Sequence, residues 1–186
     1  MSEITVEAKS LRSGLPIKLG IYKWYAPEET LKKLCKDFPS LIEEVENDEK
    51  PNSKLEYNGR TYYLVYIGTA KYMQRRLLPH VNSHTSEDIE NSTISTLRQS
   101  ISSLIAGNQN NNDDTNNIID TMLIKYECFD NSLGTLEEDL IKQYNPILNI
   151  QHNKPNSPEK IRFKNYLRRL RTSAREVALK ELKSIA

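Results

Sequence analysis

The sequence contains little cysteine. Two cysteines occur in 186 residues, at Cys35 and Cys128. Their positions do not have the spacing of a zinc site, and two distant thiols do not make a disulfide framework. We therefore expect structural thiols in a reduced, cytoplasmic protein.

Long apolar runs are also missing. No stretch approaches the roughly 18 consecutive apolar residues of a membrane-spanning helix. The first ten residues, MSEITVEAKS, lack the basic start and the apolar run of a signal peptide. We expect no membrane partner, and a length that suits one domain with an appendage rather than two full domains.

Several common catalytic motifs are absent as well. The sequence has no glycine-rich phosphate loop, no Cys/His zinc spacing and no serine nucleophile elbow. Charge is nearly balanced at +1, but segment 151–186 holds ten Lys and Arg against three Asp and Glu, while the rest holds sixteen against twenty-two. A basic arm on an acidic body is typical of a polyanion-binding element, although a solvated charged helix explains the same composition.

Hydrophobic periodicity predicts strands mixed with helices. Strands are expected at 17–25, 54–57, 60–66 and 121–129, with Asn58-Gly59 as a hairpin turn. Helices are expected at 28–49 with a break at Pro39, 71–81 with an end weakened by Pro79, 92–106, 133–144, and from Ser157-Pro158 onward. The Asn- and Asp-rich segment 108–117 is expected to be a surface loop.

Glu137 stands where a helix should carry an apolar side chain. On a helical wheel of 133–144, Glu137 falls near the middle of the apolar stripe, whereas Glu138 and Asp139 point away from it. A buried carboxylate needs a cation, a metal ion or hydrogen-bond donors. Glu137 is therefore a candidate metal ligand, although a carboxylate at the stripe's edge paired with Lys or Arg is the simpler alternative.

Arg76 and His80 are four residues apart and so share one helix face. An arginine fork suits a phosphate, and a nearby histidine can move protons. A surface pair is the alternative. A helix that ends before Pro79 would turn His80 elsewhere, and His84 would then take its place.

The sequence resembles the GIY-YIG nuclease family over about residues 17–149. Gly20-Ile21-Tyr22 and Tyr66-Ile67-Gly68 match its two triplets, and Arg76 stands eight positions after Gly68. Glu137 matches the family's acidic metal ligand, twelve residues before Asn149 in EEDLIKQYNPILN. One departure is the insertion at 27–60, since 43 residues separate the two tyrosines. Restriction-enzyme members tolerate such additions, and the sequence looks most like that branch and related uncharacterised bacterial proteins.

The resemblance implies an α/β (α+β) fold with a small, mostly antiparallel sheet flanked by helices. It divides the chain into a catalytic domain at 15–152 and a basic helical extension at 153–186. It also implies a DNA endonuclease with one Mg²⁺ or Mn²⁺ ion held by Glu137. The implied catalytic residues are Tyr22, Tyr66, Arg76, His80, Glu137 and Asn149.

In this scheme Tyr22 activates water as a phenolate assisted by His80, so Arg76, Lys71 or the metal must lower the pKa of its hydroxyl from about 10. Tyr66 orients the water or binds the phosphate, Arg76 stabilises the transition state, and Asn149 braces the site. The expected nucleic-acid contacts are Lys71, Arg98, Arg162, Arg168, Arg169, Arg171 and Arg175, with a structural ion pair as the alternative for Arg98.

Two other functions stay open. A catalytically silent nucleic-acid-binding protein would have no reason to keep the whole set of site residues. A repair or toxin-like nuclease acting on branched DNA or RNA would use the same chemistry. The sequence does not decide between a monomer and a homodimer.

Overall fold

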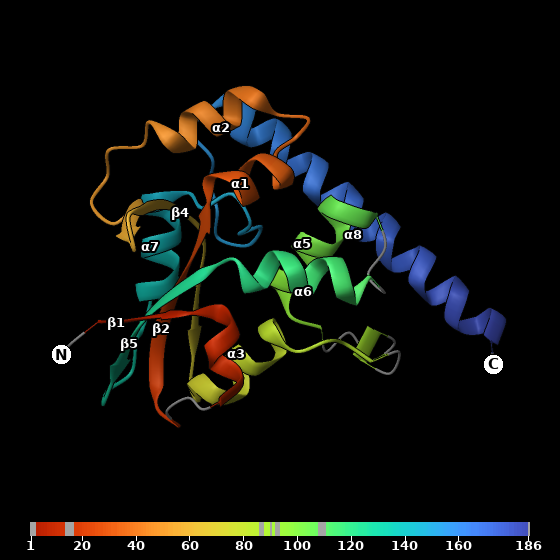
Figure 1. Cartoon of the computed structure of the whole chain (residues 1–186), viewed down its shortest axis with the longest axis horizontal. Coiled ribbons are helices and arrows are strands. Elements are labelled where there is room, and N and C mark those ends of the chain that lie inside the picture. Colours follow the sequence, from red (N-terminus) through yellow and green to blue (C-terminus); the bar gives the residue numbers. More distant parts are fainter. Residues whose placement is uncertain are drawn as a thin grey trace.

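A central antiparallel sheet organises the computed structural model, which describes residues 3–13, 17–85, 88–89, 91, 94–107 and 111–185. The strand order is β1-β5-β2-β4-β3, so β2 lies between β5 and β4 (Figure 1). The strands are β1 (Ile4–Glu7), β2 (Leu19–Pro27), β3 (Lys54–Tyr57), β4 (Arg60–Ala70) and β5 (Leu123–Phe129). This arrangement confirms the expected α+β fold.

Helices cover both faces of the sheet. They are the 3₁₀ helix η1 (Ala8–Ser13) and the α-helices α1 (Glu28–Leu34), α2 (Pro39–Glu46), α3 (Met73–Val81), α5 (Thr96–Ala106), α6 (Asn112–Asp120), α7 (Leu136–Tyr144) and α8 (Pro158–Ile185). Helix α7 packs Ile141 and Tyr144 into a smaller core on one face, and the other helices share the larger core. Among the described residues, no helix has the length and apolarity needed to cross a membrane.

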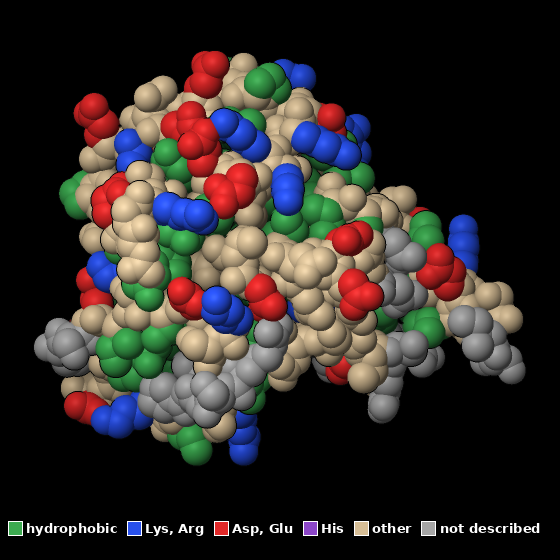
Figure 2. Space-filling view, in the orientation of Figure 1, with side chains coloured by type: hydrophobic (Ala, Val, Ile, Leu, Met, Phe, Trp, Pro, Cys, Tyr) green, Lys and Arg blue, Asp and Glu red, His purple; other side chains and the backbone are tan. Residues whose placement is uncertain are grey.

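The surface carries charges of both signs. On the face shown in Figure 2, the Lys and Arg side chains are interspersed with Asp and Glu. Helix α8 runs away from the body toward the C-terminus (Figure 1). Its first half is part of the larger core through Phe163 and Leu167, and the Phe163 ring packs edge-on against Phe38 at 5.2 Å between centroids. The proposed domain boundary at residue 152 stays a prediction.

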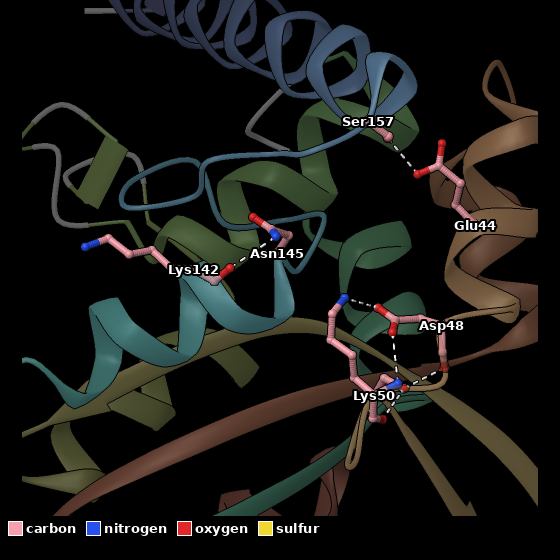
Figure 3. A network of polar contacts seen from close by, with 7 residues as sticks. Glu44, Asp48, Lys50, Lys142, Asn145 and Ser157 are labelled. Atoms are coloured by element: carbon pink, nitrogen blue, oxygen red, sulfur yellow. Dashed lines mark hydrogen bonds and ion pairs between the residues drawn. The ribbon is translucent and has the colours of Figure 1, made fainter.

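The insertion at 27–60 consists of α1, α2 and β3. Pro39 begins α2, because proline fits the first turn of a helix and ends the preceding one. Asn58 and Gly59 have φ values of 50° and 73°, as the expected two-residue hairpin requires. Ser157, the residue before α8, donates a hydrogen bond of 2.6 Å to Glu44 of α2 (Figure 3). The insertion is thus tied to the start of α8.

The expectation of a surface loop at 108–117 is wrong for residues 112–117, which form the first part of α6; residues 108–110 lie outside the described residues. The side chain of Asn111 caps the helix by accepting from the Asp114 amide at 3.1 Å. Ile118 and Ile119 are buried in the core. Asn and Asp are poor residues inside helices but good ones in the first turn, so composition alone was misleading.

Three further elements differ from expectation. Strand β1 and η1 were not anticipated, and β1 pairs with β5 through Ile4 opposite Tyr126 and Glu7 opposite Leu123. Helix α5 begins at Thr96, because Ser95 is its cap; residues 92 and 93 of the expected helix lie outside the described residues. Short edge elements carry little periodicity, and partner strands decide whether they form.

A β-bulge in β4 sets the orientation of Tyr66. The ladder with β2 pairs Tyr25 with Leu64 but Trp24 with Tyr66, so Val65 is the extra residue. Side chains alternate between faces along a strand, and one extra residue reverses the alternation. Tyr66 therefore joins the face that carries Tyr22.

Candidate active site

Tyr22 and Tyr66 lie side by side on the face of the sheet that the larger core covers. Their ring centroids are 6.5 Å apart at an interplanar angle of 23°. The two side chains are 0% and 4% exposed. Both triplets thus supply one tyrosine each to a single buried place, as the sequence predicts.

The glycine of each triplet makes room for the site. A Cβ on Gly68 would come within 2.4 Å of the Tyr22 hydroxyl oxygen, because the Tyr22 ring lies directly over Gly68. A Cβ on Gly20 would come within 2.6 Å of the Glu127 carbonyl and 2.9 Å of the Met73 sulfur. Contacts this short are prohibited, so both positions need glycine for space.

His80 completes a cluster with the two tyrosines. Its Nε2 lies 3.1 Å from the Tyr22 hydroxyl, and its ring packs against Tyr66 at 6.0 Å between centroids. Helix α3 continues through Pro79 to Val81, so His80 keeps its helical register. His84 instead binds Asn112 through its backbone, with its N–H donating to Asn112 Oδ1 at 3.1 Å. The histidine beside the tyrosines is His80.

Two neighbours of His80 were not foreseen from the sequence. The His80 Nδ1 is hydrogen-bonded to Ser95 Oγ, and Ser95 also caps α5 by accepting from the Arg98 amide at 3.2 Å. The Trp24 ring packs edge-on against the imidazole at 5.6 Å. A serine cap before a helix was the only sequence signal for Ser95, and it says nothing about histidine.

Burial controls the protonation of this cluster. The pKa of His80 lies well below 6.5. Burial is the largest cause, and electrostatic interactions with Arg76, His84 and Arg98 act in the same direction. Burial also raises the pKa of Tyr22, and the nearby Arg76 offsets only part of this effect. Desolvation thus disfavours the phenolate of Tyr22, and Arg76 by itself does not bring the pKa below its ordinary value. Both side chains are neutral.

Arg76 is the exposed member of the cluster. Burial opposes its charge, but Tyr22, Tyr66 and Glu137 together raise its pKa, so the guanidinium acts electrostatically on all three. Lys71 is exposed, with its ammonium 5.7 Å from the centre of the Tyr72 ring. Thr69, Lys71, Tyr72 and Arg76 line a shallow hollow of about 280 Å³. Lys71, Arg75 and Arg76 thus present three exposed cations to an anion bound in this hollow.

Glu137 is half-buried at the first turn of α7 and accepts a hydrogen bond from the hydroxyl of Thr69, the neighbour of Gly68. This bond uses one of about four lone-pair positions on the carboxylate. Within the described part of the chain, no three His, Cys, Asp or Glu side chains gather into a metal cluster. The donor set fits Mg²⁺, which keeps several waters and is commonly held by one or two carboxylates together with substrate phosphates.

The Asn149 side chain hydrogen-bonds the backbone of β4 where a neighbouring strand would otherwise do so. Strand β3 pairs with β4 only from Arg60 to Tyr63, which leaves the backbone beyond it without a strand partner on that side. The Asn149 side chain accepts from the Ile67 N–H and donates to the Ile67 carbonyl, both at 2.8 Å. Asn153, which the sequence did not indicate, donates to the Asn149 carbonyl at 3.0 Å. These bonds fix the backbone between Tyr66 and Gly68.

The expected nucleic-acid contacts fall into different environments. Arg98 is 1% exposed and donates to the His80 carbonyl and to Asn112 and Asn116, which favours its structural alternative. On α8, Arg162 pairs with Glu159 at 2.8 Å, and Arg169 is exposed. The remaining three arginines, Arg168, Arg171 and Arg175, line a hollow between α5 and α8.

Comparison with known proteins gives one match. The model of the GIY-YIG catalytic domain matches residues 20–173, a range that includes both triplets, Arg76, Glu137, Asn149 and more than half of α8. No curated protein matched the chain, and no solved structure matched it. Because the matched range covers most of the chain and contains the clustered tyrosines, the protein belongs to the GIY-YIG family and is a nuclease of the endonuclease superfamily.

Proposed function

We propose that the protein is a metal-dependent endonuclease that hydrolyses DNA phosphodiester bonds at this site. The observation that carries the proposal is the pairing of Tyr22 with His80 beside a guanidinium that acts on Tyr22, Tyr66 and Glu137. Hydrolysis needs an activated water, stabilisation of charge at phosphorus and correct positioning of both. The cluster supplies one group for each need.

Tyr22 and His80 form a path for the proton of the attacking water. The neutral His80 accepts the hydroxyl proton of Tyr22 at Nε2, and Tyr22 takes a proton from water as it gives up its own. The general base in this proposal is therefore a neutral Tyr22 that passes its proton to His80, in place of a free phenolate. Tyr22 is 0% exposed, so neighbouring side chains must move to admit the attacking water.

Arg76 and Tyr66 act on the phosphate. The guanidinium of Arg76 binds the non-bridging oxygens and stabilises the charge that develops on them, an effect commonly worth a factor of ~100 to 1,000 in rate for one donor. The hydroxyl of Tyr66 hydrogen-bonds the phosphate or the water. Asn149 keeps Tyr66 in place through the Ile67 backbone.

Glu137 would hold the divalent ion. Bound Mg²⁺ or Mn²⁺ supplies charge stabilisation at the phosphate and at the leaving oxygen. Glu137 carries the carboxylate, and Thr69 orients it by donating to Oε2. We propose one ion per site, and a restriction-type endonuclease is the specific activity that the insertion favours.

The test is plasmid cleavage in Mg²⁺ by the wild type, Arg76→Ala and Glu137→Gln. We expect both variants to lose activity by a factor of ~100 or more, and chelation to abolish cleavage by the wild type. Glu138→Gln is the matched control, because the Glu138 carboxylate pairs with Lys142 at 2.6 Å, away from Arg76. It should cleave like the wild type.

Three results would oppose the proposal. Equal cleavage by wild type, Arg76→Ala and Glu137→Gln would remove this site from the chemistry. Binding of DNA without cleavage by the wild type, over a series of divalent ions, would favour the silent binding protein. Cleavage of RNA or of branched DNA in preference to a linear duplex would favour a repair or toxin-like nuclease.

A further inference from the structure

A hollow of about 670 Å³ lies between α5 and α8, outside the tyrosine cluster. The side chains that line it are Thr96, Gln99, Ile150, Gln151, Arg168, Arg171, Thr172, Arg175, Glu176 and Leu179. Three arginines stand against a single carboxylate, so the hollow is basic. Amide and hydroxyl groups supply further hydrogen-bond partners, and two aliphatic side chains complete the lining.

The arginines share one helix face by their spacing. Arg168, Arg171 and Arg175 are separated by three and four residues, the spacing of neighbours on a helix. Arg168 and Arg175 are ~10 Å apart along the helix axis at 1.5 Å per residue. The phosphates of one DNA strand advance ~3.4 Å per nucleotide along the duplex axis. The row therefore spans about three phosphate-to-phosphate steps of one strand.

Two residues of the hollow adjoin, along the chain, residues that support the tyrosine cluster. Ile150 follows Asn149, the residue that fixes the Ile67 backbone, and Gln99 lies one turn after Ser95, the partner of His80. Gln99 Oε1 accepts from the Arg171 guanidinium at 2.6 Å, which orients it. Burial lowers the pKa of Arg171, while Tyr66 acts in the opposite direction. Arg171 is thus a half-buried cation within electrostatic reach of a site tyrosine.

We propose that the groove between α5 and α8 binds the DNA backbone next to the scissile phosphate, with Arg171 on the phosphate nearest Tyr66. This assignment rests on the proposed nuclease function. It divides the basic residues of α8 into two groups: Arg168, Arg171 and Arg175 contact the substrate, and the other basic side chains of the helix do not.

The test is the salt dependence of binding. A fluorescent DNA duplex is titrated with protein in chelator, so that cleavage does not occur, at salt from roughly 50 to 200 mM. Each phosphate contact contributes about 0.9 to the slope of log K against log salt. Arg171→Gln should lower the slope by about 0.9, and the triple substitution of Arg168, Arg171 and Arg175 to Gln by about 2.7.

Three further variants sharpen the test. Lys180→Gln removes one positive charge from α8 outside the groove, and it should leave the slope unchanged. Glu176→Gln removes the carboxylate from the groove and should strengthen binding. Thermal melting of each variant separates loss of a contact from loss of folding, and Arg171→Lys should keep the slope if its fold is intact.

The outcomes separate this proposal from the proposed function. If the wild type cleaves DNA and the folded triple variant binds and cleaves equally well, the groove is not the substrate track, while the nuclease assignment stands. If Glu137→Gln binds normally and the triple variant does not, the groove is supported. If the wild type neither binds nor cleaves DNA, the nuclease assignment itself fails.

A second inference concerns Ser95, which is 1% exposed and contacts His80 on the side away from Tyr22. One lone pair of Ser95 Oγ accepts from the Arg98 amide, and the other can accept from an N–H at His80 Nδ1. A proton on Nδ1 leaves Nε2 free to accept from Tyr22. We infer that Ser95 is a positioning residue that holds the imidazole in this tautomer.

The kinetics of Ser95 variants test this role. Ser95→Ala should lower kcat by about tenfold or more with little change in KM, because it disturbs proton transfer and leaves phosphate binding intact. Ser95→Thr keeps the hydroxyl and should restore most of kcat. Equal kcat values for the wild type and a folded Ser95→Ala, or a change in KM with kcat unchanged, would show that Ser95 serves only as a helix cap.

Discussion

Substitution of Gly68 by alanine should separate the geometry of the site from its stability. The new Cβ would lie 2.4 Å from the Tyr22 hydroxyl oxygen and 2.5 Å from its Cζ. An ordinary contact begins at about 3.4 Å, so the hydroxyl must move by about 1 Å. That movement disturbs the 3.1 Å contact with His80 Nε2. A misplacement of ~1 Å in an active site can lower the rate by a factor of ~100.

The same collision affects stability. Overpacking a core typically costs ~1 to 3 kcal/mol. For a chain of this length, each kcal/mol lowers the melting temperature by ~2 to 4 °C. We therefore expect Gly68→Ala to melt several degrees lower and to cleave about a hundredfold more slowly per folded molecule, as measured by thermal denaturation and plasmid cleavage.

Gly107→Ala is the matched control. Gly107 has a φ of 63°, so alanine there is strained, but among the described residues no atom is found within 4 Å of the added Cβ. This variant should lose about 1 to 2 kcal/mol from backbone strain and keep its activity. A second control is Gly68→Ala combined with Tyr22→Ala, because removing the ring removes the collision and should recover the stability lost at Gly68. Wild-type activity in Gly68→Ala, or an unchanged stability cost in the Tyr22→Ala background, would refute the reasoning.

Three other predictions follow from buried polar groups. Asn149→Leu leaves the N–H and carbonyl of Ile67 without their side-chain partner, and each buried unpaired group costs ~1 to 3 kcal/mol. Urea denaturation should therefore show a free energy of unfolding that is lower by ~2 kcal/mol or more. A decrease below about 0.5 kcal/mol would contradict the role of Asn149 as a hydrogen-bond partner of β4. Arg98→Met should lower the melting temperature and leave the salt dependence of DNA binding unchanged; a lower salt slope would instead indicate that Arg98 contacts a phosphate. The free energy of unfolding should fall as pH drops below 6.5 toward about 4. In the folded chain, burial and Arg98 lower the pKa of His84 to about 4, and the pKa of His80 lies well below 6.5, whereas both histidines of the unfolded chain take up protons in this window. Urea midpoints at several pH values check this, and an unchanged midpoint in that window would contradict it.

Glu137 could be singled out from the sequence because helical spacing is a local property. Glu137 interrupts an apolar stripe, and α7 carries it at its first turn, half-buried and beside Thr69. The choice between His80 and His84 depended on Pro79. The sequence could not decide it, because a proline weakens a helix end only when packing does not hold that end. Here Leu77 and Val81 are buried on either side of Pro79 and keep the last turn in place.

The residues that the sequence did not identify make their contacts across long separations. Ser95 is a helix cap by its neighbours, and only the packing of α5 against α3 brings it to His80. The bulge at Val65 depends on the ladder between β2 and β4. The raised pKa of Tyr22 depends on complete burial, which no local pattern shows. Periodicity finds faces of single elements, whereas these features exist only between elements.

The register between β2 and β4 has a consequence for how such a chain can diversify. Pro27 is opposite Tyr62, so the insertion leaves and re-enters the sheet at paired positions. Each doubling of a connection's length costs only about 0.6 kcal/mol in closure entropy. The ladder, and not the intervening chain, sets the distance between the two tyrosines. The connections within the insertion can therefore change in length while the ladder between β2 and β4 keeps the two tyrosines in register.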